Sequence, residues 1–185
     1  MKKYIGLVLV ALSGCILTVN AQQSFSYKNP LLPTELRVND LLGRMTLEEK
    51  IAQIRHLHSW DVFDGQVLNQ EKLDKMCGGI GYGFFEGFPL TAASCRKTFR
   101  EIQTYMVEKT RLGIPGFPVA ESLHGVVHEG TTIYPQNIAM GSTFNPELAY
   151  EKTKHIAGEL NTMGVKQVLA PCIDVVRDLR WGRVE

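Results

Sequence analysis

The chain has 185 residues, of which 44% are hydrophobic and 21% charged, and its formal net charge is +1. This composition is typical of a soluble globular domain of ordinary size and excludes a disordered or low-complexity protein. The near-neutral charge gives no support to nucleic acid or an anionic membrane surface as a partner.

Residues 1–21 have the pattern of a secretory signal peptide. Lys2 and Lys3 precede an apolar run over residues 4–19, and Ala21 completes a small-residue cleavage site. The apolar run is short for a membrane span. We therefore predict an exported bacterial protein, periplasmic or extracellular, cleaved after Ala21. The alternative is a lipoprotein anchored through Cys15, which ends a lipobox-like Leu-Ser-Gly-Cys motif but is followed by further apolar residues.

Removal of residues 1–21 leaves 18 basic and 19 acidic side chains and three cysteines, Cys77, Cys95 and Cys172. The odd number and the spacing of these cysteines fit neither a disulfide framework nor a metal site. We expect buried free thiols.

Four helices are predicted after an extended leader over residues 22–33. The first begins at Thr34, and the second begins at Thr46, which forms a capping box with Glu49. An apolar stripe at helical spacing predicts the third helix over residues 95–113. The fourth helix begins at Asn145, which has the side chain of an N-cap and is followed by proline, and it ends at Gly164.

Three strands are predicted between these helices, over residues 78–85, 116–121 and 165–173. The glycine-rich first strand indicates that another backbone packs closely against it. Strands that alternate with helices favour a parallel sheet, and both a barrel and an open doubly wound sheet fit this order. In either fold, ligand groups gather at the carboxyl ends of the strands, where Glu121 and Asp174 are placed.

Four ordered segments carry a resemblance to a known family. They are LLGRMTLEEKIAQI (41–54), RLGIPGFPVAESLHGV (111–126), TTIYPQNIAMGSTFNPEL (131–148) and LAPCIDVVRDLRWGRVE (169–185). Together they resemble the N-terminal domain of glycoside hydrolase family 3, which contains β-glucosidases and β-xylosidases. The resemblance covers nearly the whole chain from residue 30.

This resemblance implies an α/β fold in which residues 34–185 form the first part of a (β/α)8 TIM-type barrel, truncated after about three strand–helix units. It also implies hydrolysis of β-glucosides or β-xylosides with retention, by a nucleophilic carboxylate and an acid/base carboxyl group. The matching catalytic aspartate and glutamate lie beyond residue 185, so no catalytic residue is expected within this chain. The family implies no cofactor and no metal.

Glu121 and Arg183 are the predicted substrate-binding residues. A carboxylate at a strand end accepts hydrogen bonds from two sugar hydroxyls at once, and the extra methylene of glutamate over aspartate favours a pentose. Arg183 matches a family arginine that hydrogen-bonds the bound sugar through its fork of donors.

Supporting roles are expected for the polar residues around these two. Arg177, Asp178 and Arg180 are predicted to form an ion-pair network above a packed Trp181. Asp174 is predicted to pair with an arginine. His124 is predicted to orient Glu121 through a hydrogen bond.

The sequence contains two closely spaced histidine pairs. His124 and His128 have the spacing of zinc ligands on a helix, but they flank a glycine in a loop and have no third ligand nearby. His56 and His58 are expected to diverge and are given no role. A nucleotide site is not supported, because the nearest glycine motif, residues 79–83, lies within a predicted strand.

The predicted protein is therefore the N-terminal fragment of an exported retaining β-glycosidase, with an oligosaccharide or β-glycoside as its partner. By itself the 185-residue chain is expected to be inactive and poorly soluble, because three strands do not close a barrel. The alternatives are a non-catalytic carbohydrate-binding module and a doubly wound periplasmic binding domain, whose strand order would reverse.

Overall fold

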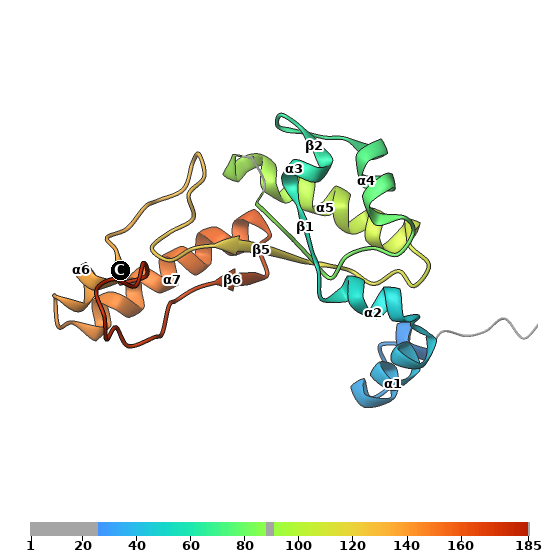
Figure 1. Cartoon of the computed structure of the whole chain (residues 1–185), viewed down its shortest axis with the longest axis horizontal. Coiled ribbons are helices and arrows are strands. Elements are labelled where there is room, and N and C mark those ends of the chain that lie inside the picture. Colours follow the sequence, from blue (N-terminus) through green and yellow to red (C-terminus); the bar gives the residue numbers. More distant parts are fainter. Residues whose placement is uncertain (1–25, 88–90, 185) are drawn as a thin grey trace, which may run out of the picture. The chain divides into compact units, whose positions relative to one another are not determined.

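The computed structural model describes residues 26–87 and 91–184, which fall into two compact units divided between Arg44 and Met45 (Figure 1). The predicted signal peptide, its cleavage site at Ala21 and the alternative anchor at Cys15 lie outside the described residues.

The first unit contains a short 3-10 helix, η1 (Ser26–Lys28), and the helix α1 (Thr34–Arg44). Asp40 Oδ2 accepts a hydrogen bond from the backbone nitrogen of Tyr27 at 3.0 Å, and Arg37 Nε donates to the Tyr27 carbonyl oxygen at 2.9 Å. Residues 26–28 are therefore folded against α1, whereas the sequence predicted an extended leader.

The second unit begins with α2 (Leu47–Gln53), and its predicted capping box is confirmed. The Thr46 hydroxyl accepts from the Glu49 nitrogen at 3.2 Å, and Glu49 Oε2 accepts from the Thr46 nitrogen at 2.9 Å. These two bonds satisfy backbone donors that the first turn of a helix otherwise leaves unpaired.

Glu49 is buried, and its carboxylate also pairs with a distant arginine. Arg111 Nε donates to Glu49 Oε1 at 2.7 Å, and Arg111 Nη2 lies 2.5 Å from Glu49 Oε2. This bidentate bond holds the pKa of Glu49 below its ordinary value, and the bond from the Thr46 backbone acts in the same direction. The pair connects α2 to the turn before β5.

Replacing Glu49 by glutamine is expected to speed local opening of α2 by about tenfold at pH 7, because the charge-assisted bonds to Arg111 are weakened. The lowered pKa means that the ionised pair stabilises the fold above about pH 4.3 and that this contribution disappears as the pH falls through the folded-state value. Amide hydrogen exchange of residues 47–54 measures the effect as a ratio of variant to wild type. An equal ratio at pH 7 and pH 3, or the same change in Glu108→Gln, would contradict this assignment.

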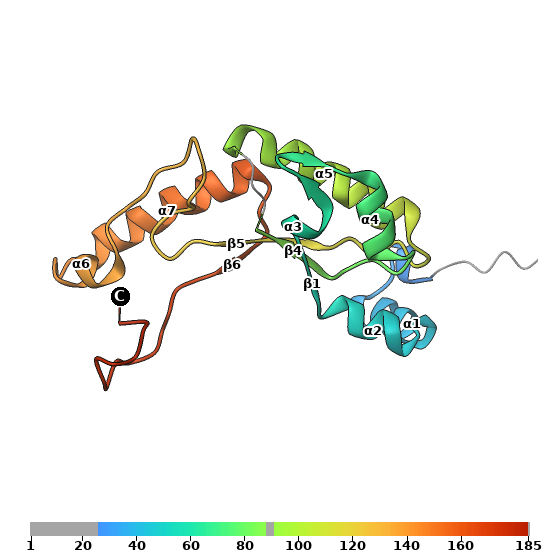
Figure 2. The same cartoon turned by 45° about the horizontal axis from the view of Figure 1, so that its top comes forward.

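A four-stranded parallel sheet forms the centre of the second unit (Figure 2). Its strands are β1 (His56–His58), β4 (Phe84–Glu86), β5 (Phe117–Glu121) and β6 (Gln167–Leu169). All neighbours are parallel, and their order in space is their order in the chain. A doubly wound sheet reverses its strand order, so this order identifies the first part of an incomplete TIM-type barrel.

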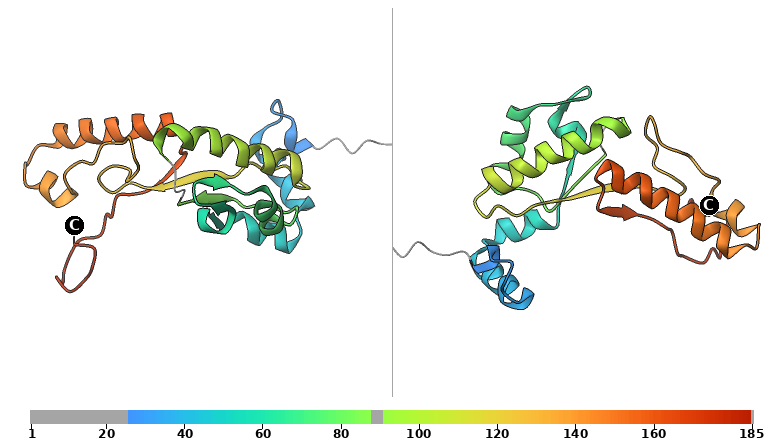
Figure 3. Two further views of the ribbon diagram at one scale, coloured as in Figure 1. Left: turned by 90° about the horizontal axis from the view of Figure 1, so that it is seen from above. Right: turned by 180° about the vertical axis from the view of Figure 1, so that it is seen from behind.

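The two long helices, α5 (Ala92–Lys109) and α7 (Pro146–Met163), lie on the same side of the strands (Figure 3). The Asn145 side chain caps α7, and Gly164 ends it with a left-handed φ of 92°, as predicted. Alternation along each strand directs Leu57 and Phe85, both fully buried, toward these helices. The core between the sheet and the helices includes Cys95, Phe99, Ile102, Met106, Ile156, Leu160 and Met163.

Two strand predictions were too long, and one strand of the parallel sheet was missed. Residues 78–83 form turns and an irregular segment before β4. Residues 170–173 continue as coil after β6, and Ile173 is 84% exposed. β6 ends at Leu169 because its neighbour β5 ends at Glu121, opposite Leu169, so residues 170–173 have no strand to pair with. The missed strand is β1, which contains only three residues.

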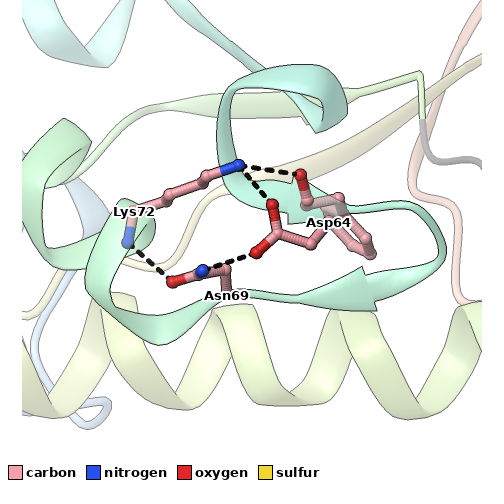
Figure 4. Close-up of polar contacts among 4 residues, drawn as sticks. Asp64, Asn69 and Lys72 are labelled. Atoms are coloured by element: carbon pink, nitrogen blue, oxygen red, sulfur yellow. Dashed lines mark hydrogen bonds and ion pairs between the residues drawn. The ribbon is translucent and has the colours of Figure 1, made fainter.

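The connection from β1 to β4 was also not predicted. It contains α3 (Ser59–Val62), the hairpin strands β2 (Phe63–Asp64) and β3 (Val67–Leu68), and α4 (Gln70–Cys77). Asp64 links the hairpin to α4 by accepting from Asn69 Nδ2 at 2.6 Å and pairing with Lys72 Nζ at 2.5 Å (Figure 4). Asn69 in turn caps α4 through the backbone nitrogen of Lys72.

Cys77, Cys95 and Cys172 are free, in agreement with the prediction, although Cys172 is only half-buried. Burial raises the pKa of the Cys77 thiol to about 12 and that of Cys95 to about 11. These two thiols are therefore protonated and inert at neutral pH. Within residues 26–87 and 91–184, no helix is both long and apolar enough to cross a membrane.

Candidate functional site

The candidate site lies at the carboxyl edge of the parallel sheet, where polar side chains end three adjacent strands. His58 ends β1, Glu86 ends β4 and Glu121 ends β5. The register pairs His58 with Glu86, whereas Glu121 extends one pleat farther and pairs with Leu169 of β6. Parallel strands present these ends at one edge, so the fold gathers the polar groups there.

Glu121 is exposed at the end of β5, as the sequence predicted. Its carboxylate has no hydrogen-bond or ion-pair partner among the described residues. Four lone-pair sites are thus free to accept donors such as sugar hydroxyls.

His124 does not form the expected hydrogen bond to Glu121. Its Nδ1 lies 3.0 Å from the backbone oxygen of Tyr134, and its own carbonyl oxygen accepts from the Tyr134 nitrogen at 2.8 Å. A side chain at Gly125 would place its Cβ 2.3 Å from the carbonyl oxygen of Thr132. His124 therefore fixes the loop that follows Glu121 against residues 132–134, and glycine is needed beside it for steric reasons.

The same loop is attached to α7 by a buried lysine. Lys152 Nζ donates to the carbonyl oxygen of Pro135 at 3.1 Å and to Asn137 Oδ1 at 2.9 Å. Burial lowers the pKa of Lys152. These bonds fix the start of α6 (Asn137–Gly141) on α7. The sequence did not suggest this role, since Lys152 lies among the polar residues of an amphipathic helix.

The segment after β6 carries the other predicted residues and has no regular structure. Of the expected network only one pair forms, with Arg180 Nη2 at 2.5 Å from Asp178 Oδ2, and this pair lowers the pKa of Asp178. Asp174 and Arg177 are exposed and have no ion-pair partner among the described residues, so the expected pairing of Asp174 with an arginine is not formed.

Arg183 and Trp181 lie in the same segment. Arg183 is exposed, and its Nη1 lies 3.7 Å from the Cys172 thiol. Trp181 is 37% exposed, so it is only partly packed. Both follow β6, the neighbour of the strand that ends at Glu121. The structure thus places Arg183 and Glu121 after adjacent strand ends but forms no contact between them among the described residues.

His56 and His58 do not diverge as the sequence analysis expected. Residues i and i+2 of a strand point to the same face, so the two imidazoles converge. Both approach the carboxylate of Glu86, with His56 Nδ1 at 2.9 Å from Oε2 and His58 Nδ1 at 3.5 Å from Oε1. The signal was present in the sequence as alternation around the buried Leu57. Within the described part of the chain, no group of three or more potential ligands has the arrangement of a metal site.

The model of the glycosyl hydrolase family 3 N-terminal domain matches residues 46–185. The chain belongs to this family. The match spans β1 to the end of the segment with Arg183, so the sheet edge described above is part of the family 3 domain. The resemblance drawn from the four sequence segments is confirmed.

Named relatives of this family 3 chain are glycosidases. A protein named as a β-xylosidase from Formosa agariphila is 32% identical over 88% of this chain. A periplasmic β-glucosidase from Salmonella typhimurium is 29% identical over 98% of it. A β-glucosidase structure from Erythrobacter marinus superposes on 88% of this chain with a TM-score of 0.71 at 29% identity.

The family 3 chain spans 22% of the length of each of these three relatives. A complete barrel needs further strands to cover the open face and edge of the sheet.

Proposed function

We propose that the chain is the N-terminal part of an exported retaining β-glycosidase that hydrolyses β-glucosides or β-xylosides. The observation that carries this proposal is the free carboxylate of Glu121 at the carboxyl edge of a family 3 sheet. The β-xylosidase and β-glucosidase names of the relatives support the substrate class, and the periplasmic relative supports export.

In this proposal the chain binds and orients the sugar, and other residues cleave the bond. Glu121 accepts hydrogen bonds from two neighbouring hydroxyls of the non-reducing sugar. Arg183 donates to the same ring. The nucleophile and the acid/base belong to the rest of the protein. This chain together with that remaining part is termed the complete enzyme. Retention follows when the two carboxyl groups lie about 5 Å apart.

The other supporting residues act on backbone position. His124 and Lys152 fix the loop after Glu121, and Asp178 with Arg180 shapes the segment that leads to Arg183. A sugar-binding residue on a fixed loop loses less conformational entropy when substrate binds, which favours tighter binding.

The complete enzyme is expected to release p-nitrophenol from the aryl β-xyloside or β-glucoside and to yield the β-anomer first, as followed by proton NMR. The 185-residue chain alone is expected to show no turnover, because it lacks the catalytic pair. Saturable turnover by the chain alone, or the α-anomer as first product of the complete enzyme, would contradict the proposal. Glycan binding by the complete enzyme without hydrolysis would instead identify a binding module.

A further inference from the structure

Glu86 lies between two imidazoles at the carboxyl edge of the sheet, and the proposed function does not use this cluster. The three side chains, Glu86, His56 and His58, are 22% to 33% exposed. They occupy the sheet face opposite the helices, because Leu57 and Phe85, which alternate with them, are fully buried in the core.

Two atoms of this cluster are buried without a hydrogen-bond partner in the described structure, namely His58 Nδ1 and Glu86 Oε2. The short contact of Glu86 Oε2 with His56 Nδ1 is an electrostatic contact that lacks hydrogen-bond geometry. Buried polar atoms are nearly always paired in folded proteins, and leaving them unpaired is costly. Because these two atoms are themselves inaccessible, a ligand with hydroxyl groups would contact the exposed parts of the same side chains, which are 22% exposed for Glu86 and 33% exposed for His58.

An exposed indole lies beside these atoms. Trp60 is the second residue of α3, two positions after the end of β1, and it is 68% exposed. Its ring stacks on the imidazole of His58, with centroids 4.4 Å apart and planes inclined by 7°. One face of the indole is therefore held by His58. An amphipathic aromatic ring next to the partly exposed side chains of Glu86 and His58 is suited to a pyranose, which has apolar C–H groups on one face and hydroxyls on its rim.

The loops that carry this cluster are attached to each other. Ser59 Oγ donates to the carbonyl oxygen of Gly87, and Gly87 has a left-handed φ of 71°. A Cβ at Gly87 would lie 3.4 Å from Trp60 Cζ3, in contact with the indole. The ends of β1 and β4 thus place Trp60, His58 and Glu86 on one connected surface.

This surface faces the same way as Glu121. The register pairs Glu86 with Val119, and Glu121 lies two residues beyond Val119 on the same face of the sheet. From strand spacing and rise, the Cα atoms of Glu86 and Glu121 are ~8 Å apart, and β1 lies one strand farther away. β1 lies two strand spacings, ~10 Å, from β5, so Trp60 after β1 and Glu121 at the end of β5 fit two adjacent sugar rings better than one.

We propose that Trp60, His58 and Glu86 bind the sugar residue adjacent to the one bound by Glu121. This inference rests on the proposed function and adds a second saccharide subsite to it. Trp60 stacks on the ring, while Glu86 and His58 hydrogen-bond its hydroxyls. The subsite makes this chain a determinant of preference for oligosaccharides over monosaccharide glycosides.

The test uses the complete enzyme with xylobiose or cellobiose, whichever it cleaves faster, and the matching free monosaccharide as a competitive inhibitor. Trp60→Ala is expected to raise KM for the disaccharide about 3- to 10-fold, while the inhibition constant of the monosaccharide changes less than twofold. Trp60→Phe is expected to keep most of the affinity. Glu86→Gln is expected to raise KM about tenfold through the lost charge-assisted bond.

Tyr150→Ala serves as the matched control, because Tyr150 is similarly exposed, at 61%, on α7. It is expected to change neither constant. Equal shifts of the disaccharide KM and the monosaccharide inhibition constant in Trp60→Ala would place Trp60 on the first sugar and overturn the inference. An unchanged value of both constants would overturn it as well, because Trp60 would then contact neither sugar. Absence of any hydrolysis by the wild type would refute the proposed function itself, which distinguishes the two failures.

Discussion

Replacing Glu121 by alanine in the complete enzyme is expected to lower kcat/KM for an aryl β-xyloside or β-glucoside by about 1,000-fold. The carboxylate has no partner among the described residues, so its loss leaves no protein group unpaired and removes only contacts to substrate. Two charge-assisted hydrogen bonds at about 1.5 to 3 kcal/mol each account for a factor of this size. Glu121→Gln keeps the shape and is expected to lose about 100-fold.

Glu129→Gln is the matched control, since Glu129 is also exposed and lies eight residues farther along the chain. Its kcat/KM is expected to remain within twofold of the wild type. Initial rates below KM measure all three variants under one condition. Wild-type kcat/KM in Glu121→Ala would remove Glu121 from the sugar site.

Glu121→Asp examines the sugar preference. The shorter side chain vacates the space that a hexose uses for its hydroxymethyl group, so the ratio of β-glucosidase to β-xylosidase activity is expected to rise about tenfold. The same two aryl glycosides measure this ratio. An unchanged ratio would show that Glu121 does not contact the ring near that position.

Replacing Gly83 by alanine is expected to destabilise the second unit by about 4 kcal/mol or more. A Cβ at Gly83 would lie 1.8 Å from the carbonyl oxygen of Gln53, which is backbone and has no rotamer by which to move away. The Gly83 nitrogen also donates to the Ala52 carbonyl oxygen at 3.1 Å at this crossing. Relief requires α2 and the start of β4 to separate, at the cost expected for gross overpacking.

Gly158→Ala provides the control for this substitution. Gly158 lies within α7, and a Cβ there would meet nothing within 4 Å. This change is expected to stabilise the fold by about 0.5 to 1 kcal/mol, because alanine favours the helix. Soluble yield and the temperature of half-unfolding of the complete enzyme distinguish the two variants. A Gly83→Ala protein as stable as the wild type would contradict the close approach of the two backbones.

The close approach at Gly83 was visible in the sequence as a run of glycines, whereas the boundaries of β4 were not. Glycine marks where a side chain does not fit, and that information is local. The length of β4 depends on β1 and β5, which pair with it from 28 residues before and 33 residues after. A three-residue strand such as β1 has too little periodicity for the sequence to reveal it.

The amino-acid sequence by itself determined the start of α2, both ends of α7, the buried thiols of Cys77 and Cys95, the family and the carboxylate that ends β5. These features depend on neighbours within a few positions, such as Thr46 with Glu49 or Asn145 with Pro146. Only the tertiary structure decided the strand order, the attachment of His124 to Tyr134 rather than to Glu121, and the convergence of His56 and His58 on Glu86. The physical reason is that hydrogen-bond partners far apart in the chain are chosen by the register of the sheet, which no single segment encodes.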